Sequence, residues 1–466
     1  MTRKRAFLTI LLIATTSIAL FDLSRTELVR PEYQLLDFRV SYCAGAAVDA
    51  RADAYRVEPI RSCEHAHPTP LLARTPNLVL AWVLPGYDLA PLAALARLPF
   101  DAAAVVYVLA LCAALAGAVV LIARTTGAPP AMTSAALVLS AGLPSLVLGQ
   151  VVPFELLAVA ATAAALRARR ERLAGALAAL TCIEPHVGLF VCAALAYAVA
   201  GARLTIAAGL AVLALLAVAV TGLEAQITYV LQDLPLQALS EVTSKEQFSL
   251  AYVLSYAGLP VRAALAAGAV STLAMLVVAT ILARRARVRG DAYVVYLPAA
   301  AAIVGGTYVH LAQVALAIPA ALLALRDADS PRLRGAIAFA IVLLAIPWPY
   351  PATLKQLLPA ALLIVGVLTW YLTRGSIVRT LAAAACCWLV LIPIENHLTG
   401  PPPVLALAAR PAGELATVSG AEATHAESTR DPFHFAVKVA TWSGLLLLTG
   451  SSMLLAARSA QSPRPA

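Results

Sequence analysis

The stretch DAAAVVYVLALCAALAGAVVLIA, residues 101–123, decides the class of fold. Its only charged residue is Asp101 at the first position, and Arg124 follows its end. A helix needs about 20 apolar residues to cross the hydrocarbon core of a bilayer. A strand of a membrane β-barrel is shorter and alternates apolar with polar residues, and this stretch does neither. It therefore predicts a transmembrane helix.

Similar apolar runs fill most of the chain. Of its 466 residues, 61% are apolar and 13% are charged, whereas soluble domains contain about 45–50% and about 25%. We expect an all-α polytopic membrane protein, a single domain over 1–466 with about 12–14 transmembrane or half-membrane helices. The other runs are 6–20, 131–148, 151–166, 174–200, 204–222, 262–283, 292–307, 311–325, 335–347, 357–373, 377–393 and 436–457.

Short arginine-rich links join several of these runs. Arginine and lysine gather in cytoplasmic loops, so these links predict the cytoplasmic side, and Arg3, Lys4 and Arg5 place the N-terminus there as well. The net charge of +9 comes from such clusters, so we expect no nucleic-acid partner. The links thus predict a multi-pass membrane protein whose N-terminus lies in the cytoplasm. The links are 167–172, 284–289, 326–334 and 374–379.

The first run, 6–20, has two interpretations. Its basic start and apolar centre are also typical of a signal peptide, but no A-x-A-like cleavage site follows. We expect an uncleaved first helix.

Three longer segments are predicted to be extracytoplasmic: 23–100, 223–260 and 394–435. The later part of the first, 76–99, is apolar and rich in proline, which favours helices that lie along the membrane surface. The end of the chain, 459–466, is expected to be a disordered cytoplasmic tail.

The run 174–200 contains Glu184-Pro185-His186 at its middle. It is too short for two full spans, so proline should divide it into two half-helices. The intramembrane carboxyls of Glu155 and Glu184, with His186, would also suit a transporter or lipid flippase with a site at the membrane midplane. A non-catalytic assembly scaffold is another possible function, besides a transporter or flippase and the enzymatic function considered below.

Three polar residues near the predicted outer surface are candidates for chemistry. Asp37 lies just beyond the first run, where a partly desolvated carboxylate suits general-base catalysis. His310 lies at the outer end of a pair of runs, and Gln150 lies in a tight glycine turn. For each residue the alternative is a purely structural role.

Two cysteines, Cys43 and Cys63, fall in the first outer segment. An oxidising compartment favours a disulfide between them. The cluster Cys63-Glu64-His65-Ala66-His67 lacks the spacing of a four-ligand metal site, so no metal is expected. Nucleotide-binding motifs are missing from the sequence, and we expect no cofactor.

Several of these features occur in an order that resembles glycosyltransferase family 87. Asp37-Phe38, Tyr42 and Asp53-Ala54-Tyr55 resemble that family's opening motif, although alanine replaces its proline. Gly149-Gln150 is similar to its Gly-Gln turn, without the asparagine that follows there. The segment RRERLAGALAALTCIEP, residues 169–185, resembles a motif that ends in Lys-Pro, here Glu-Pro. The resemblance covers about 6–325, and His310 takes the place of the family's outer-face histidine.

The resemblance implies a GT-C-type helical bundle that uses a polyprenyl-phosphate-linked sugar. Asp37 would take the proton of the acceptor hydroxyl, and the anomeric centre would invert. His310 would bind phosphate or assist the acceptor. The implied sugar is mannose, and the acceptor is a glycolipid or glycan at the outer surface of the membrane. Substrate-binding roles are implied for Tyr42, Tyr55 and Gln150, while Arg39 and Arg262 are candidates for stabilising the charge of the leaving phosphate, which would make a metal unnecessary.

Overall fold

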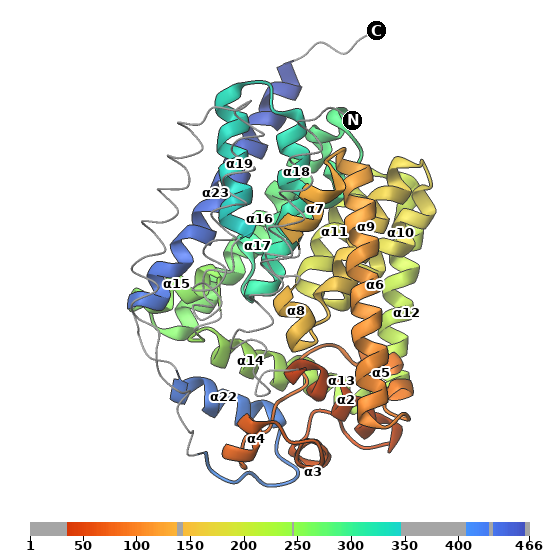
Figure 1. Ribbon diagram of the computed structural model, residues 1–466, viewed down its shortest axis with the longest axis vertical. Helices are drawn as coiled ribbons and strands as arrows, with labels where there is room; N and C mark the ends of the chain where they lie inside the picture. Colours follow the sequence, from red (N-terminus) through yellow and green to blue (C-terminus); the bar gives the residue numbers. More distant parts are fainter. Residues whose placement is uncertain (1–34, 138–142, 245–246, 346–406, 428–431, 462–466) are drawn as a thin grey trace.

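The computed structural model describes residues 35–137, 143–244, 247–345, 407–427 and 432–461 (Figure 1). Within these ranges the regular secondary structure is helical, apart from two isolated β-bridges, and loops join the helices. This confirms the prediction of an all-helical protein. The predicted runs 6–20, 357–373 and 377–393 lie outside the described residues.

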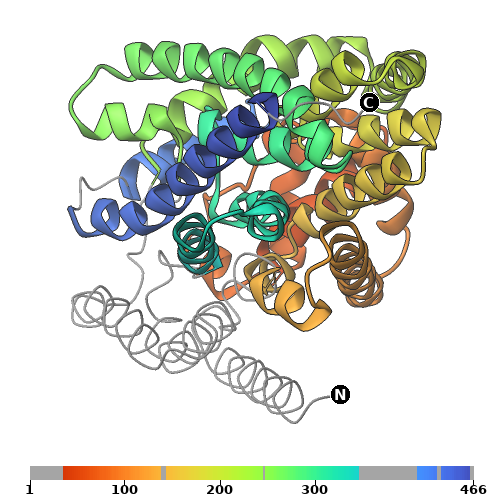
Figure 2. The same cartoon turned by 90° about the horizontal axis from the view of Figure 1, so that it is seen from above.

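The longer helices run side by side and form a bundle, which is seen along its length in Figure 1 and from above in Figure 2. Among the described residues, four helices are long and apolar enough to cross a membrane, and two shorter apolar helices accompany them. The bundle consists of α6 (Phe100–Thr126), α7 (Pro130–Leu137), α8 (Leu143–Leu148), α9 (Val152–Arg167), α10 (Glu171–Leu180), α11 (Pro185–Ala198), α12 (Arg203–Thr221), α16 (Val261–Ala286), α17 (Tyr293–Gly305), η8 (Leu311–Ala317), α18 (Ile318–Asp327), α19 (Pro331–Ala345) and α23 (Pro432–Gln461).

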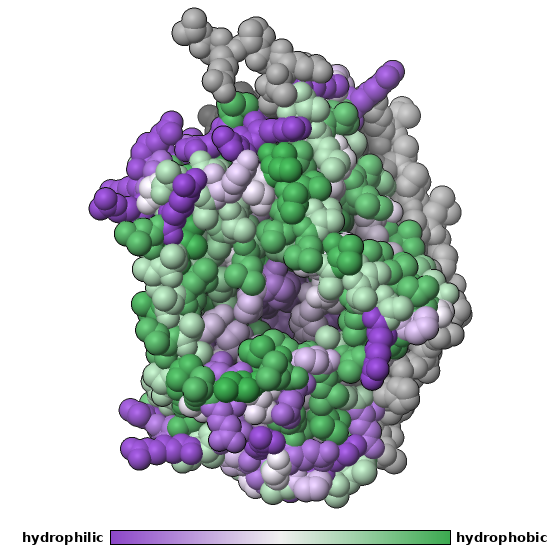
Figure 3. Space-filling model, turned by 180° about the vertical axis from the view of Figure 1, so that it is seen from behind, coloured by the Kyte–Doolittle hydropathy of each residue, from purple (hydrophilic) through white to green (hydrophobic). Residues whose placement is uncertain are grey.

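Small side chains fill the contacts between these helices, while large apolar ones point outward. Ala160, Ala163 and Ala299 are completely buried, whereas Leu204 is 80% exposed and Leu215 is 70% exposed. Figure 3 shows the exposed apolar residues as a band between two hydrophilic ends. Close packing through small residues and an apolar outer surface are both typical of helices in a bilayer.

The run 174–200 is divided as predicted. Helix α10 ends at Leu180, a 3-10 turn follows over Thr181–Ile183, and α11 begins at Pro185. Proline has no backbone N–H and suits the first turn of a helix, so it ends one helix and begins the next. Glu184 lies at the break.

The arginine-rich links 167–172, 284–289 and 326–334 meet at one end of the bundle, here called the arginine end. The Arg167 guanidinium donates to the carbonyl of Arg124 at 2.6 Å, and that of Arg287 donates to the carbonyl of Ala198 at 2.6 Å. These hydrogen bonds also satisfy carbonyls at helix C-termini, which have no partner within the helix. Helix α23 continues to Gln461, into the segment that was expected to be a disordered tail.

The opposite end, here called the loop end, contains the shorter helices of the predicted outer segments. It lies at the bottom of Figure 1. Cys43 and Cys63 are joined there by a disulfide. Segment 76–99 contains only a short 3-10 turn and α5. The helices of this end are α2 (Leu36–Asp49), α3 (Val57–Ala66), α4 (Pro70–Arg74), η2 (Gly86–Asp88), α5 (Leu89–Leu95), α13 (Leu223–Thr228), the π-helical turn η6 (Tyr229–Asp233), α14 (Leu234–Glu241), α15 (Leu250–Tyr256) and α22 (Ala416–Glu427).

Segments far apart in the sequence are tied together at the loop end. The N–H of Ala416 donates to the carbonyl of Tyr55 at 2.9 Å, and Arg56 forms a β-bridge with Leu415. The ring of Tyr55 lies 5.1 Å from that of Tyr229. The first and last of the predicted outer segments therefore share one core, which is separate from the core of the bundle.

Candidate active site

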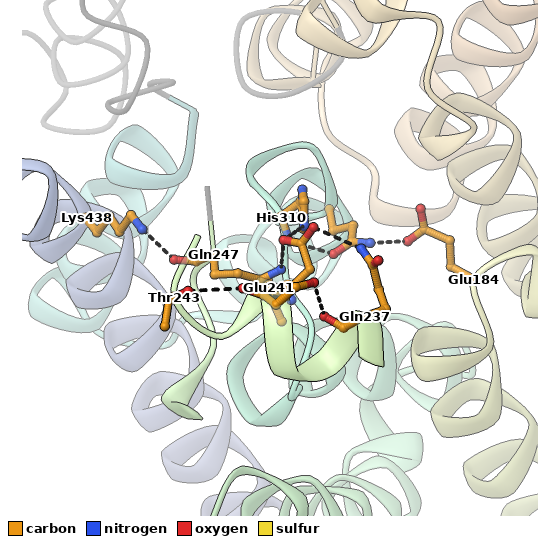
Figure 4. Close-up of polar contacts among 10 residues, drawn as sticks. Glu184, Gln237, Glu241, Thr243, Gln247, His310 and Lys438 are labelled. Carbon is orange, nitrogen blue, oxygen red and sulfur yellow. Dashed lines mark hydrogen bonds and ion pairs between the residues drawn. The ribbon is translucent and has the colours of Figure 1, made fainter. Parts of the chain in front are cut away.

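Helix α14 carries the carboxylate at the centre of the candidate site. Helix α13, the turn η6 and α14 follow one another without a break, and Glu241 is the last residue of α14. Its carboxylate accepts hydrogen bonds from the side-chain amides of Gln237 at 2.9 Å and Gln247 at 3.2 Å. The Nε2 atom of His310 lies 3.3 Å from the same carboxylate. Figure 4 shows these side chains converging from separate elements.

His310 is held by the backbone on both of its sides. It pairs with Gln247 in an isolated antiparallel bridge, and it is the N-cap residue of η8. Its own N–H donates to the side chain of Gln313 at 2.8 Å. Its ring lies 4.7 Å from the ring of Tyr308. The imidazole therefore has a defined position between a carboxylate and an aromatic ring.

Charge interactions keep Glu241 ionised although it is almost buried. Burial alone would raise the pKa of Glu241. The hydrogen bond and charge of His310, with the amides of Gln247 and Gln237, outweigh burial and hold the pKa of Glu241 below its ordinary value. The His310–Glu241 pair therefore presents an imidazole beside a carboxylate that is ionised at neutral pH, an arrangement that favours imidazolium.

A second carboxylate is joined to this pair from the side of the bundle. The amide of Gln313 donates to Glu184 at 2.5 Å, and the ring of His186 lies 3.7 Å from Glu184. Glu155 is completely buried. Its main charge interaction is with Glu184. Of the carboxyls predicted at the midplane, Glu184 is therefore the one that reaches the candidate site.

Asp37 lies in the first turn of α2 and is half-buried. The start of α2 is fixed by a hydrogen bond of 2.7 Å from the N–H of Leu35 to the carbonyl of Val147. The charge of Asp37 acts on the hydroxyls of Tyr107 and Tyr308. The ring of Tyr308 lies 4.7 Å from that of His310, so Tyr308 is affected by the charges of both Asp37 and Glu241.

The glycine turn before Gln150 sets the approach of α2. Gly149 has φ of +77°, and a Cβ atom there would lie 2.6 Å from the Cβ of Phe38. Only glycine meets both demands without strain. Gln150 itself is half-buried, and its side-chain oxygen has no hydrogen-bond partner among the described residues. It remains a candidate for substrate binding.

Four other predicted substrate-binding residues lie elsewhere. The hydroxyls of Tyr42 and Tyr55 donate to the backbone carbonyls of Leu98 and Leu84, and both rings are buried, which favours structural roles. Arg39 is buried against the ring of Phe100, 5.1 Å from its centre. Arg262 is exposed near the start of α16. The structure does not bring these four side chains to the His310–Glu241 pair.

Sequence reasoning missed Glu241, Gln247 and Gln313. Glu241 lies in a polar outer segment with other acids, and nothing in its local sequence distinguishes it from them. Gln313 occurs three residues after His310, the spacing of a helix cap, which was the one available signal.

The surface of the bundle is hollowed at the middle of one face. Figure 3 shows a hydrophilic recess there, surrounded by the apolar band. In the described part of the chain, no cluster of three or more His, Cys, Asp or Glu side chains is arranged to hold a metal ion. A polar recess that opens through an apolar surface suits a ligand with both a polar group and a lipid chain.

The apolar helices define a multi-pass membrane protein, and the His310–Glu241 pair lies near the loop end of its bundle. Residues 85–304, just under half of the chain, match the family model described as glycosyltransferase family 87. This segment is a glycosyltransferase family 87 domain. No curated protein and no solved structure matches the chain. The matched segment contains Glu184 and Glu241, whereas Asp37 precedes it and His310 follows it.

Proposed function

We propose that the protein transfers a hexose, mannose being the first candidate, from a polyprenyl-phosphate donor to a glycolipid or glycan acceptor at the extracytoplasmic face. The observation that carries this proposal is the His310–Glu241 pair, whose atoms lie 3.3 Å apart in a chain that matches glycosyltransferase family 87 over residues 85–304. Asp37 is proposed as the base. A base for the acceptor and a cation for the leaving phosphate are the two groups that such a transfer needs. The polar recess within the apolar band supports a donor that approaches from the bilayer.

The reaction is a single displacement. The acceptor oxygen forms a bond to the anomeric carbon while the bond from that carbon to the phosphate oxygen breaks, and the phosphate leaves with the electron pair. Asp37 takes the proton of the acceptor hydroxyl. Attack from the face opposite the leaving group inverts the anomeric centre. The imidazole of His310, kept cationic by Glu241, neutralises charge that develops on the phosphate.

The sidedness of the proposal follows from charge. The arginine end is proposed to face the cytoplasm, because arginine-rich links gather there. The loop end, with the disulfide between Cys43 and Cys63, is then extracytoplasmic, where disulfides persist. Cysteine labelling of position 37 with a membrane-impermeant reagent tests this: labelling only from the cytoplasmic side would contradict it.

The test of function is transfer by the purified protein. It is incubated with polyprenyl-phosphate-mannose and extracted lipids, and products are examined for a mass increase of one hexose. Asp37→Asn should reduce the rate about a hundredfold or more, because general-base catalysis contributes about 10²–10⁴. The matched control is Asp49→Asn at the other end of α2, whose carboxylate pairs with Arg97 at the surface.

Two outcomes would contradict the proposal. Transfer by Asp37→Asn at the wild-type rate would remove the assigned base. Loss of function in Glu184→Gln with normal function in Asp37→Asn would instead favour the transporter reading. Glu155, Glu184 and His186, the residues that suggested a transporter, all lie within the glycosyltransferase family 87 domain.

A further inference from the structure

Helix α23 lies outside the glycosyltransferase domain and yet buries a lysine beside the candidate site. Lys438 is completely buried, and its ammonium donates to the backbone carbonyl of Gln247 at 2.7 Å. The same ammonium lies 3.6 Å from the centre of the Tyr252 ring and 5.4 Å from that of Phe248. A buried ammonium is costly unless such partners hold it. Lys438 is therefore fixed where it contacts Gln247.

Gln247 connects this lysine to the catalytic side chains. Its side-chain oxygen accepts from the N–H of Val309 at 3.0 Å, and its side-chain nitrogen donates to Glu241 at 3.2 Å. Because a backbone N–H can only donate, it determines which end of the amide faces Val309 and which faces Glu241. Gln247 is thus oriented as a donor to the carboxylate of Glu241.

A second residue of α23 supports the same stretch of backbone. The indole of Trp442 donates to the carbonyl of Phe248 at 2.9 Å, and the N–H of Phe248 donates to the carbonyl of Val309 at 2.7 Å. The backbone of Gln247 and Phe248 is held by α23 on one side and by the residue before His310 on the other. Figure 4 shows this path from Lys438 through Gln247 to Glu241 and His310.

We propose that Lys438 is a positioning residue: by holding the carbonyl of Gln247, it fixes the amide that orients the His310–Glu241 pair. This inference rests on the proposed function in one respect, which is that the His310–Glu241 pair takes part in sugar transfer. It gives the C-terminal helix, which the family domain does not include, a role in the active site. Lys438 itself touches no reacting atom.

The first test is a double-mutant cycle on transfer activity. Lys438→Met keeps an unbranched chain among the aromatic rings but cannot donate to Gln247. We expect kcat to fall about tenfold, with KM for the donor changed less than about twofold, since the interaction acts on orientation in the transition state. In the Glu241→Gln background the same substitution should have little further effect. Independent, additive losses in the two variants would overturn the proposal.

The second test needs no turnover. Diethyl pyrocarbonate modifies accessible imidazoles, and peptide mass spectrometry gives the rate at each histidine. Lys438→Met should change the rate at His310 several-fold and leave that at His65, in the distant α3, unchanged. The matched control is Arg458→Met, which breaks the contact of α23 with Asp329 at the arginine end and should alter neither rate nor kcat.

The two tests separate the two proposals. A wild-type protein that transfers no hexose contradicts the proposed function, while the modification rate of His310 still decides the role of Lys438. An unchanged rate at His310 in Lys438→Met would overturn the positioning role even if the wild type is active.

Discussion

The bundle and the loop end are held together in different ways. The bundle core consists mostly of alanine, leucine and valine. The loop-end core contains Phe38, Tyr55, Trp82, Tyr107 and Tyr229, and the disulfide lies beside it. Helices in lipid gain little from burying apolar surface and pack instead through small residues. A water-exposed end depends on aromatic burial and on contacts between distant segments.

This contrast has a consequence for function. Asp37 and Glu241 are carried by elements of the loop end, and the helices of the bundle supply the frame beneath them. Changes at the loop end should therefore affect activity or stability more than similar changes in the bundle. The following pairs of substitutions test that difference, first in catalysis and then in stability.

The first pair compares two buried carboxyls. Glu241→Gln should lower kcat for sugar transfer about tenfold to a hundredfold, because the ionised partner of His310 is lost. Glu155→Gln, in the bundle, should remain within about twofold of the wild type, since a neutral amide of the same shape can replace the buried carboxyl beside Glu184. Steady-state kinetics of the purified variants measure both. A larger loss of kcat in the Glu155 variant than in the Glu241 variant would contradict the expectation that the loop end matters more for catalysis.

The second pair compares two glycines. Gly149→Ala would place a Cβ 2.6 Å from that of Phe38 at a positive φ, and should destabilise the protein by about 1–3 kcal/mol. Gly450→Ala, in α23, meets nothing within 4 Å and should be neutral or slightly stabilising. Thermal unfolding in detergent gives both values. Equal stability of the two variants would show that the close approach of α2 is not required.

The third pair compares cysteines. Replacing both Cys43 and Cys63 by alanine should cost about 2–4 kcal/mol of stability, because the disulfide restricts the unfolded chain. Activity should fall as well, since Cys43 lies on the same helix as Asp37. Cys112→Ala, at an exposed position of α6, should leave both unchanged. Unfolding curves with and without a reductant check the disulfide, and an insensitive wild type would contradict the expectation.

The smallest effect concerns pH. Burial raises the pKa of Glu64, in α3, to about 8, against the partial effects of a hydrogen bond from Leu80 and the charge of Arg39. The folded state therefore binds a proton that the unfolded state releases near its ordinary pKa, and stability should fall as pH rises from about 4.5 to about 8.

Glu64→Gln should remove this part of the pH dependence. The melting temperature of this variant should change less between pH 5 and pH 8 than that of the wild type. The variant should be the more stable protein at the higher pH. Parallel slopes for the two proteins would show that Glu64 does not titrate in this range.

Much of the fold could be predicted from the sequence. The apolar run 101–123 is long enough that no other secondary structure suits it, and α6 occupies Phe100–Thr126. Glu184-Pro185 indicated the break between α10 and α11, because proline cannot continue a helix from the preceding turn. The conformational limits of proline and the length of helix that a bilayer requires both depend on a short stretch of chain. A short stretch of sequence is therefore enough to predict them.

The site could be predicted only in part. Asp37 and His310 could be recognised as candidates. Tyr42 and Tyr55 were also predicted to bind substrate, but in the structure their hydroxyls donate hydrogen bonds to backbone carbonyls. The partner of His310 was not foreseen, because Glu241 lies in a different segment and nothing local links them.

What the sequence determined by itself was the class of protein: a helical membrane protein with short arginine-rich links and longer polar segments between its apolar runs. Only the tertiary structure decided that Glu241 and Gln247 lie beside His310 and Val309, and that Lys438 of α23 contacts the backbone of Gln247. Helix formation depends on neighbours within a few residues and on the solvent around them. The meeting of distant polar groups depends on how the whole bundle packs, and short-range sequence patterns do not contain that information.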